Sequence, residues 1–438
     1  MKHGFLSISE ISPQSDIMKI RSEWETLKEV MMHQPGTEID YAMLAPRAFL
    51  FERPFRSRIA LQEHEGLQLT LKENGVKVRL LRDTVIDAAD QNTNFRKELE
   101  NKVLETVRFF GNLQKSSNAK GELERNIRSL DSATLFNIMT LEPSIDLKSD
   151  SEPGSEYPTV YSNVPLANLY FMRDQQAVAP GGVIFGRMKR LQRMKEPEIT
   201  EFVIKKALGF HTSVKINGDG IFEGGDFMPA GNFALIGIGS RTNLAGALQA
   251  IESGYLDYDE VGIVENPVYD FMAGSPKDPM VNMHLDTYFN IAGDGVAIGS
   301  AELMRKAKLT VFAGHGDQRG KTLRQCTLFE FLKEKHFNFV ELGVAEQLAY
   351  SSNFLTIKDR RIITVNVSNV LDRLLNEGIF PKYIEDQVKA DLGRRGRNDL
   401  FPNNRSVREM GIEHIEVKLT ELTGGYGGAH CMTAALSR

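Results

Sequence analysis

Cysteine is scarce in this chain of 438 residues, which contains only Cys326 and Cys431. Two cysteines cannot build a disulfide framework, so we expect a reducing compartment and predict a cytoplasmic protein. The zinc-binding spacings CxxC, HxxxH and HExxH are also missing. Their absence disfavours a metal site, and the residues call for no metal or other cofactor.

The sequence also lacks a strong excess of one charge sign and any long apolar run. Its formal net charge is -5, and no block of Lys and Arg stands out as a footprint for a polyanion. These features exclude a typical nucleic-acid-binding protein. No stretch approaches the length of a membrane span or the apolar core of a signal peptide. The sequence therefore predicts an enzyme in solution, with neither nucleic acid nor a membrane as partner.

One pattern recurs five times along the chain: a short strand, a turn rich in Gly, Asp or Asn, a second strand and an amphipathic helix. The five occurrences begin at LKEVMMHQPG, NLYFMRD, EGGDFMPAG, HLDTYFNIAG and NFLTIKDRR. Weak repeats of this kind indicate a closed ring of similar units rather than one open sheet. We therefore predict an α/β fold, a pseudo-symmetric propeller with five blades.

The segment 87–148 interrupts this pattern with helical periodicity. Phe95, Leu99 and Val103 repeat every four residues, as in a helix with one buried face. We predict a helical insertion over 87–148, and a discontinuous catalytic propeller formed by residues 1–86 and 149–438. A solvated helical hairpin without a function is an equally good interpretation of the insertion.

Charged residues gather in short segments beside glycine or at expected strand ends. Asp174 is expected at the end of a strand, and the alternation in HLD places His284 and Asp286 on one face of another. Glu223 and Asp226 are separated by two glycines, and Cys431 follows a glycine pair, where backbone can approach a ligand closely. We expect these side chains to face one common opening.

Such a set of acids favours a cationic substrate. Several buried carboxylates repel one another unless a positive group lies between them. A guanidinium is planar and offers five N–H donors, which carboxylates can bind in pairs. The same cation beside a thiol stabilises the thiolate, the nucleophilic form of cysteine.

At these motifs the sequence resembles the arginine deiminase family of the guanidino-group-modifying enzymes, or penteins. NLYFMRD, EGGDF, LIGIGSRTN, HLDTYF and GGAHCMT occur in the family's order, and 87–148 lies where the family carries a helical insertion. The resemblance implies a hydrolase that converts L-arginine to L-citrulline and ammonia through a covalent cysteine thiouronium. It further implies no cofactor and a homo-oligomer.

The resemblance also implies a role for each matched residue. Cys431 corresponds to the nucleophile, His284 to the general acid and base, and Glu223 to the acid beside that histidine. Asp174 and Asp286 correspond to the pair that grips the guanidinium. The implied substrate-binding residues are Asn168, Phe171, Arg193, Arg241 and Asp226, with Arg190 as the substitute if Arg193 is misaligned.

Three positions depart from the family's pattern. Tyr426 stands where an arginine usually lies in a mobile loop, Glu52-Arg53 replaces an acidic pair, and Gln175 replaces a proline. These departures leave two alternatives open. One is an amidinotransferase or a hydrolase of another guanidino compound; the other is a non-catalytic pentein that binds arginine.

Three further residues are not assigned a catalytic role. His315 is expected in a turn, and Cys326 is expected to pack into the core from a helical face. His430 precedes the predicted nucleophile, and the sequence leaves open whether it tunes that residue or points away.

Overall fold

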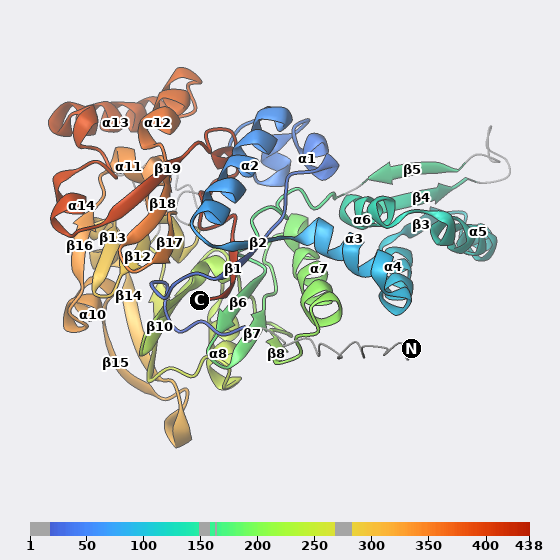
Figure 1. Cartoon of the computed structure of the whole chain (residues 1–438), viewed down its shortest axis with the longest axis horizontal. Helices are drawn as coiled ribbons and strands as arrows, with labels where there is room; N and C mark the ends of the chain where they lie inside the picture. Colours follow the sequence, from blue (N-terminus) through green and yellow to red (C-terminus); the bar gives the residue numbers. More distant parts are fainter. Residues whose placement is uncertain (1–17, 149–157, 163, 268–282) are drawn as a thin grey trace, which may run out of the picture.

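The computed structural model describes residues 18–148, 158–162, 164–267 and 283–438 (Figure 1). They form an α/β structure in which helices lie outside small sheets. The described strands form four three-stranded sheets and one five-stranded sheet in the main body, and a further three-stranded sheet in a projecting part. No helix in these described ranges is both long and apolar enough to cross a membrane.

The five sheets of the body share one pairing pattern, in which two antiparallel strands are followed by a third that runs parallel to the second. In this order the strands are β20 (Ala434–Ser437), β1 (Glu29–Met32) and β2 (Lys77–Leu80); β6 (Gln176–Ala179), β7 (Gly182–Phe185) and β8 (Ser213–Lys215); β9 (Phe227–Ala230), β10 (Phe233–Ile238) and β11 (Glu260–Glu265); β12 (Phe289–Gly293), β13 (Val296–Gly299) and β16 (Asn338–Glu341); and β17 (Leu355–Lys358), β18 (Arg361–Val365) and β19 (Glu413–Val417).

Two additional strands, β14 (Lys308–Ala313) and β15 (Thr322–Thr327), extend the sheet of β9–β11. Cys326 lies in β15, half-buried against a hydrophobic cluster. The prediction that Cys326 sits on a helix is therefore wrong, although its side chain does pack toward the core. A Thr327 capping box starts the helix at Leu328, two residues after Cys326.

Apolar stripes explain the helices that cover the sheets. In α12 (Val367–Asn376), Val367, Val370, Leu371 and Leu374 are buried, which is the spacing of one helix face, and the Asn366 side chain caps the first turn. The remaining helices of the body are α1 (Thr37–Ala42), α2 (Ser57–Glu73), α7 (Glu196–Phe202), α8 (Leu244–Glu252), α9 (Ala301–Lys306), α10 (Leu328–Glu334), α11 (Val344–Leu348), α13 (Lys382–Arg395) and α14 (Arg405–Glu409).

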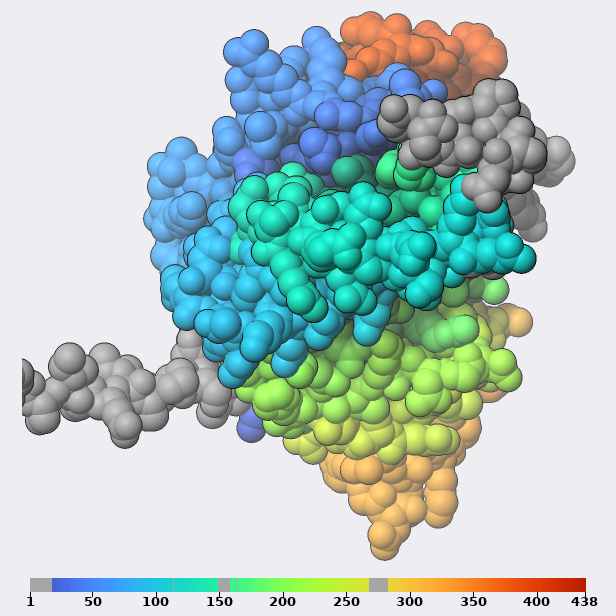
Figure 2. Space-filling model, turned by 90° about the vertical axis from the view of Figure 1, so that its right-hand side faces the viewer, coloured from blue at the N-terminus to red at the C-terminus, as the bar shows by residue number. Residues whose placement is uncertain are grey.

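The projecting part is helical, as the periodicity of 87–148 indicates. It contains α3 (Leu81–Gln91), α4 (Thr93–Thr106), α5 (Ser116–Ser129), α6 (Ser132–Leu141) and a sheet of β3 (Arg108–Gly111), β4 (Pro143–Leu147) and β5 (Thr159–Ser162). These helices cover one face of the molecule (Figure 2). The sequence did not indicate the sheet, because its strands are short and half-exposed.

Candidate active site

Four of the predicted site residues lie in turns that shortly precede the first strand of a sheet. Asp174 lies in a turn before β6, Asp226 ends a 3-10 turn before β9, and Asp286 lies in a 3-10 turn before β12. Cys431 precedes β20 in the same way. The prediction that His284 and Asp286 share a strand is wrong, as is that of a strand over NLYFMRD. In both segments the chain turns, which brings the side chains together at one end of several sheets.

His284 is fully buried between carboxylates. Its Nε2 atom is 2.9 Å from Glu223 Oε2, and its Nδ1 atom is 3.6 Å from Asp174 Oδ1. Burial disfavours the imidazolium, but Asp174, Glu223 and Asp226 together raise the pKa of His284 to about 9. The side chain is therefore cationic at neutral pH.

We expect the imidazole of His284 to titrate near pH 9 rather than near its ordinary value. Because the pKa is raised in the folded state, this residue stabilises the fold fully below about pH 6.5, and that contribution is lost as the pH rises through about 9. An NMR titration of the ring should show this. Glu223→Gln should lower the His284 pKa, whereas an unchanged value would contradict the role of that carboxylate.

Glu223, which contacts His284, is also paired with Arg241. Burial alone would raise the pKa of Glu223, but Arg241 and His284 hold it well below its usual range. The Arg241 Nη1 atom is 3.5 Å from Glu223 Oε2, and the Lys189 N–H donates to Glu223 Oε1 at 2.9 Å. Glu223 thus remains ionised while it orients His284.

Cys431 is 2% exposed and lies beside an acid and an amide. Its Sγ atom is 3.5 Å from Asp286 Oδ2 and 3.0 Å from Asn353 Nδ2. Burial and then the charges of Asp286 and Asp174 raise the pKa of the Cys431 thiol well above its usual value. The thiol is therefore protonated in the absence of a ligand, and a cation bound between the two aspartates would favour the thiolate.

Each of these aspartates keeps one buried oxygen without a hydrogen bond. Asp174 Oδ1 and Asp286 Oδ1 have no partner among the described residues, and neither has His284 Nδ1. Leaving such groups unsatisfied costs free energy, so the site calls for hydrogen-bond donors. The other oxygen of Asp286 is 2.8 Å from His430 Nδ1. This contact settles the question about His430, which points toward the site.

Asp174 Oδ2 is occupied by Arg193. The buried Arg193 guanidinium donates to Asp174 at 2.6 Å and to Glu196 at 2.8 and 3.0 Å. Its Nη2 atom also approaches the carbonyls of Asn168 and Phe171, at 3.5 and 3.3 Å. Glu196 is a site residue that the sequence did not indicate. Burial, opposed by Arg193, raises the pKa of Glu196 to about 7.

The other predicted substrate residues border the same region. The Asn168 amide donates to the Phe49 carbonyl at 2.8 Å, and Arg241 Nη2 contacts Met283 Sδ at 3.3 Å. Asp226 Oδ1 accepts from the Leu285 N–H at 3.0 Å and from Asn266 Nδ2 at 2.8 Å, so it supports the turn that carries His284. Arg190, the substitute for Arg193, is half-buried, and its Nε atom has no hydrogen-bond partner in the described part of the chain.

Two glycines let the cysteine loop approach Phe171 closely. A Cβ atom on Gly425 would overlap the Tyr170 hydroxyl, and one on Gly427 would lie 2.7 Å from the Phe171 ring and 3.1 Å from Cys431 Sγ. The Phe171 ring therefore lies against the loop that carries Cys431. Its position beside a substrate stays a prediction.

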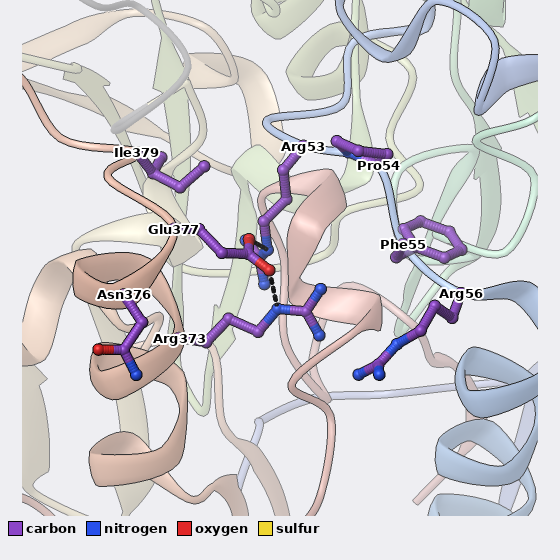
Figure 3. Close-up of a pocket in the computed structure, with 8 residues that line it drawn as sticks. All are labelled: Arg53, Pro54, Phe55, Arg56, Arg373, Asn376, Glu377 and Ile379. Atoms are coloured by element: carbon purple, nitrogen blue, oxygen red, sulfur yellow. Dashed lines mark hydrogen bonds and ion pairs between the residues drawn. The ribbon is translucent and has the colours of Figure 1, made fainter.

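A separate cavity of about 870 Å³ opens outside this loop (Figure 3). Buried Arg53 donates to the Thr420 carbonyl at 2.7 Å and to Thr423 Oγ1 at 3.1 Å, and Glu421 pairs with Arg56 and Arg373. The lining residues are Arg53, Pro54, Phe55, Arg56, Arg373, Asn376, Glu377 and Ile379. Arg53, one of the residues that depart from the family's pattern, thus holds the segment 420–423, which leads to Tyr426.

Comparison with known proteins places the chain in a family. The model of the family described as "Arginine deiminase" matches residues 47–438. This chain belongs to the arginine deiminase family. It is 26% identical to an arginine deiminase of Halobacterium salinarum, covering 98% of this chain and 99% of that protein. It is 27% identical to one of Staphylococcus aureus, covering 96% of this chain and 98% of the other.

Solved structures of low sequence identity also resemble this chain. Unliganded AgrE superposes with a TM-score of 0.50 at 14% identity, over 94% of this chain and 39% of AgrE. The structure of DDAH from Pseudomonas aeruginosa with citrulline gives 0.47 at 15% identity, over 93% of this chain and 98% of that one.

Proposed function

We propose that this chain is an arginine deiminase that hydrolyses L-arginine to L-citrulline and ammonia through a covalent thiouronium on Cys431. The observation that carries the proposal is a pair of buried, unsatisfied carboxylate oxygens, on Asp174 and Asp286, beside a cysteine and a cationic histidine. A guanidinium supplies the donors and the charge that these oxygens lack.

In the first half-reaction, Asp174 and Asp286 bind the nitrogens of the substrate guanidinium and hold its carbon against Cys431. The bound cation lowers the free energy of the thiolate, so the thiol loses its proton to water. The thiolate then attacks that carbon and forms the S–C bond. His284, cationic at neutral pH, gives its proton to one terminal nitrogen. The C–N bond breaks, ammonia leaves and a thiouronium cation remains.

In the second half-reaction, the neutral His284 takes a proton from water, whose oxygen adds to the thiouronium carbon. The S–C bond then breaks, and the electron pair returns to sulfur. The resulting thiolate takes the hydroxyl proton of the new ureido group and becomes a thiol again. The products are citrulline and the enzyme with its original complement of protons. Glu223 keeps the histidine oriented through both halves, because its hydrogen bond to Nε2 leaves Nδ1 directed toward Asp174.

We also propose that the amino-acid end of arginine is recognised by Asn168, Arg193 and Arg241, with Phe171 packed beside the chain and Asp226 supporting the site. Arg241 would select against agmatine, which has no carboxylate. Arg193 would have to exchange part of its contact with Asp174 or Glu196 for the substrate. Arg190, with its unpartnered Nε atom, is the substitute in this role.

The architecture completes the proposal. A five-bladed propeller formed by residues 1–86 and 149–438 is supported by the five sheets of like pairing, and by the β20–β1 pair that joins the two ends of the described chain. The helical segment 87–148 would be an insertion into it. We place the enzyme in the cytoplasm as a homo-oligomer, without a cofactor.

Product analysis tests the function. Incubation with free L-arginine should give citrulline and ammonia in equal amounts, and agmatine should be a poor substrate. Ornithine formed in the presence of an amine acceptor would instead identify an amidinotransferase. Arginine binding without any product would identify a binding protein. A panel of guanidino compounds, assayed for ureido product, would reveal a different preferred substrate.

A further inference from the structure

Asn353 occupies the fifth of the turns that precede a first strand. It lies two residues before β17, as Asp174 lies two residues before β6, and Cys431 lies three residues before β20. The side chain is 1% exposed. No charged motif marks it in the sequence, where it stands in YSSNF.

The hydrogen bonds of Asn353 fix the orientation of its amide. Oδ1 accepts from the N–H groups of Gly428 and Cys431, at 2.7 and 3.0 Å. Backbone N–H groups only donate, so the atom facing them must be the oxygen. The NH₂ group is therefore turned to the other side, where Cys431 Sγ lies at 3.0 Å and the Asp286 carbonyl at 3.3 Å.

We propose that Asn353 is a further catalytic residue, whose amide N–H binds the Cys431 sulfur and stabilises it whenever it carries negative charge. The charge of Asp286, whose Oδ2 atom is 3.5 Å from this sulfur, and the charge of Asp174 both oppose its ionisation. A neutral amide can offset them without competing for the guanidinium, because it brings no positive charge that would repel the substrate.

The catalytic part of this inference rests on the proposed function. Sulfur is charged twice in that cycle, as the attacking thiolate and again as the group expelled from the hydrated thiouronium. A hydrogen bond to sulfur strengthens at both points and weakens while sulfur is bonded to carbon. Asn353 would therefore act on both half-reactions.

Two variants separate the N–H from the other contacts. Asn353→Asp is isosteric and keeps an oxygen for the Gly428 and Cys431 N–H groups, but removes the donor. Asn353→Ala removes the donor without adding charge. Asn290→Ala is the matched control, because the Asn290 amide holds the flanking carbonyls of Ser352 and Phe354 at 3.0 and 2.8 Å.

The readout is the pKa of the Cys431 thiol, from the ultraviolet absorbance of the thiolate as the pH rises. Subtracting the matching Cys431→Ser protein removes Cys326 from the signal. We expect the thiolate fraction at neutral pH to fall by about tenfold to a hundredfold in Asn353→Ala, as for loss of a hydrogen bond to a charged group, and further in Asn353→Asp. Asn290→Ala should lower the melting temperature and leave the thiol pKa unchanged.

Folded Asn353 variants with the wild-type thiol pKa would overturn the proposal. If both variants fail to fold, NMR of the wild-type protein decides: the Asn353 side-chain amide resonance must shift as the thiol ionises, and a resonance indifferent to that titration overturns it. A wild-type protein that shows these shifts but releases no citrulline would refute the proposed function and still support the hydrogen bond between the Asn353 amide and the Cys431 sulfur.

Discussion

Cys431→Ser should lose arginine turnover by about 10⁴-fold or more in kcat, while arginine still binds. The serine hydroxyl is far less acidic than a thiol, so the bound cation cannot convert it into a useful nucleophile. Asp174 and Asp286 remain to hold the guanidinium, and calorimetry should therefore detect binding. Steady-state citrulline formation measures the loss.

Cys326→Ser is the natural control for this variant. Its sulfur lies in β15, half-buried and far along the chain from the site, and its replacement should leave kcat unchanged. Turnover by Cys431→Ser at a rate close to that of the wild type would exclude the covalent mechanism.

Gly225→Ala should reduce kcat by about 100-fold or more without unfolding the protein, since a displacement of about 1 Å at reacting groups has an effect of this size. A Cβ atom at this position would lie 2.7 Å from Asp174 Oδ1 and 2.7 Å from His284 Nδ1. One of the two side chains must move away, which separates the acid from the histidine. Citrulline release and an NMR titration of His284 would measure the consequence.

Gly66→Ala provides the comparison. Gly66 lies inside α2, and a Cβ there would meet nothing within 4 Å. This substitution should raise the free energy of unfolding by about 0.5–1 kcal/mol and leave activity unchanged. Equal activity of Gly225→Ala and Gly66→Ala would show that the space between Asp174 and His284 is not used in the reaction.

The acids and the cysteine could be found from the sequence because each stands in a short, charged or glycine-rich motif. Asp174 and Asp286 were expected on strands, yet both lie in turns. A period of two residues does not distinguish a strand end from a 3-10 turn over three residues. The prediction of strands was therefore wrong about the local backbone at Asp174 and Asp286, but right that their side chains lie close together.

Asn353 and Glu196 show what motif analysis could not supply. Glu196 matters because folding buries it against Arg193, a contact made by tertiary packing that leaves no mark in KEPE. For Asn353 a signal did exist. The fifth repeat begins its first strand at Leu355, and the acids of other repeats lie one to three residues before the corresponding strand. The segment 352–354 is therefore equivalent to the turns that carry those acids. Treating the repeats as equivalent would have pointed to it.

The glycine pair before Tyr426 lies between Arg53 on one side and Tyr170 on the other. A methyl group on Gly424 would lie 3.3 Å from the Arg53 stem, on the side of the outer cavity, whereas one on Gly425 would collide with Tyr170 on the inner side. Arg53 also lines the outer cavity, so a compound bound there would contact the side chain that packs against Gly424. We expect such a compound not to compete with the substrate, because no residue that lines the outer cavity is among the proposed arginine-binding residues.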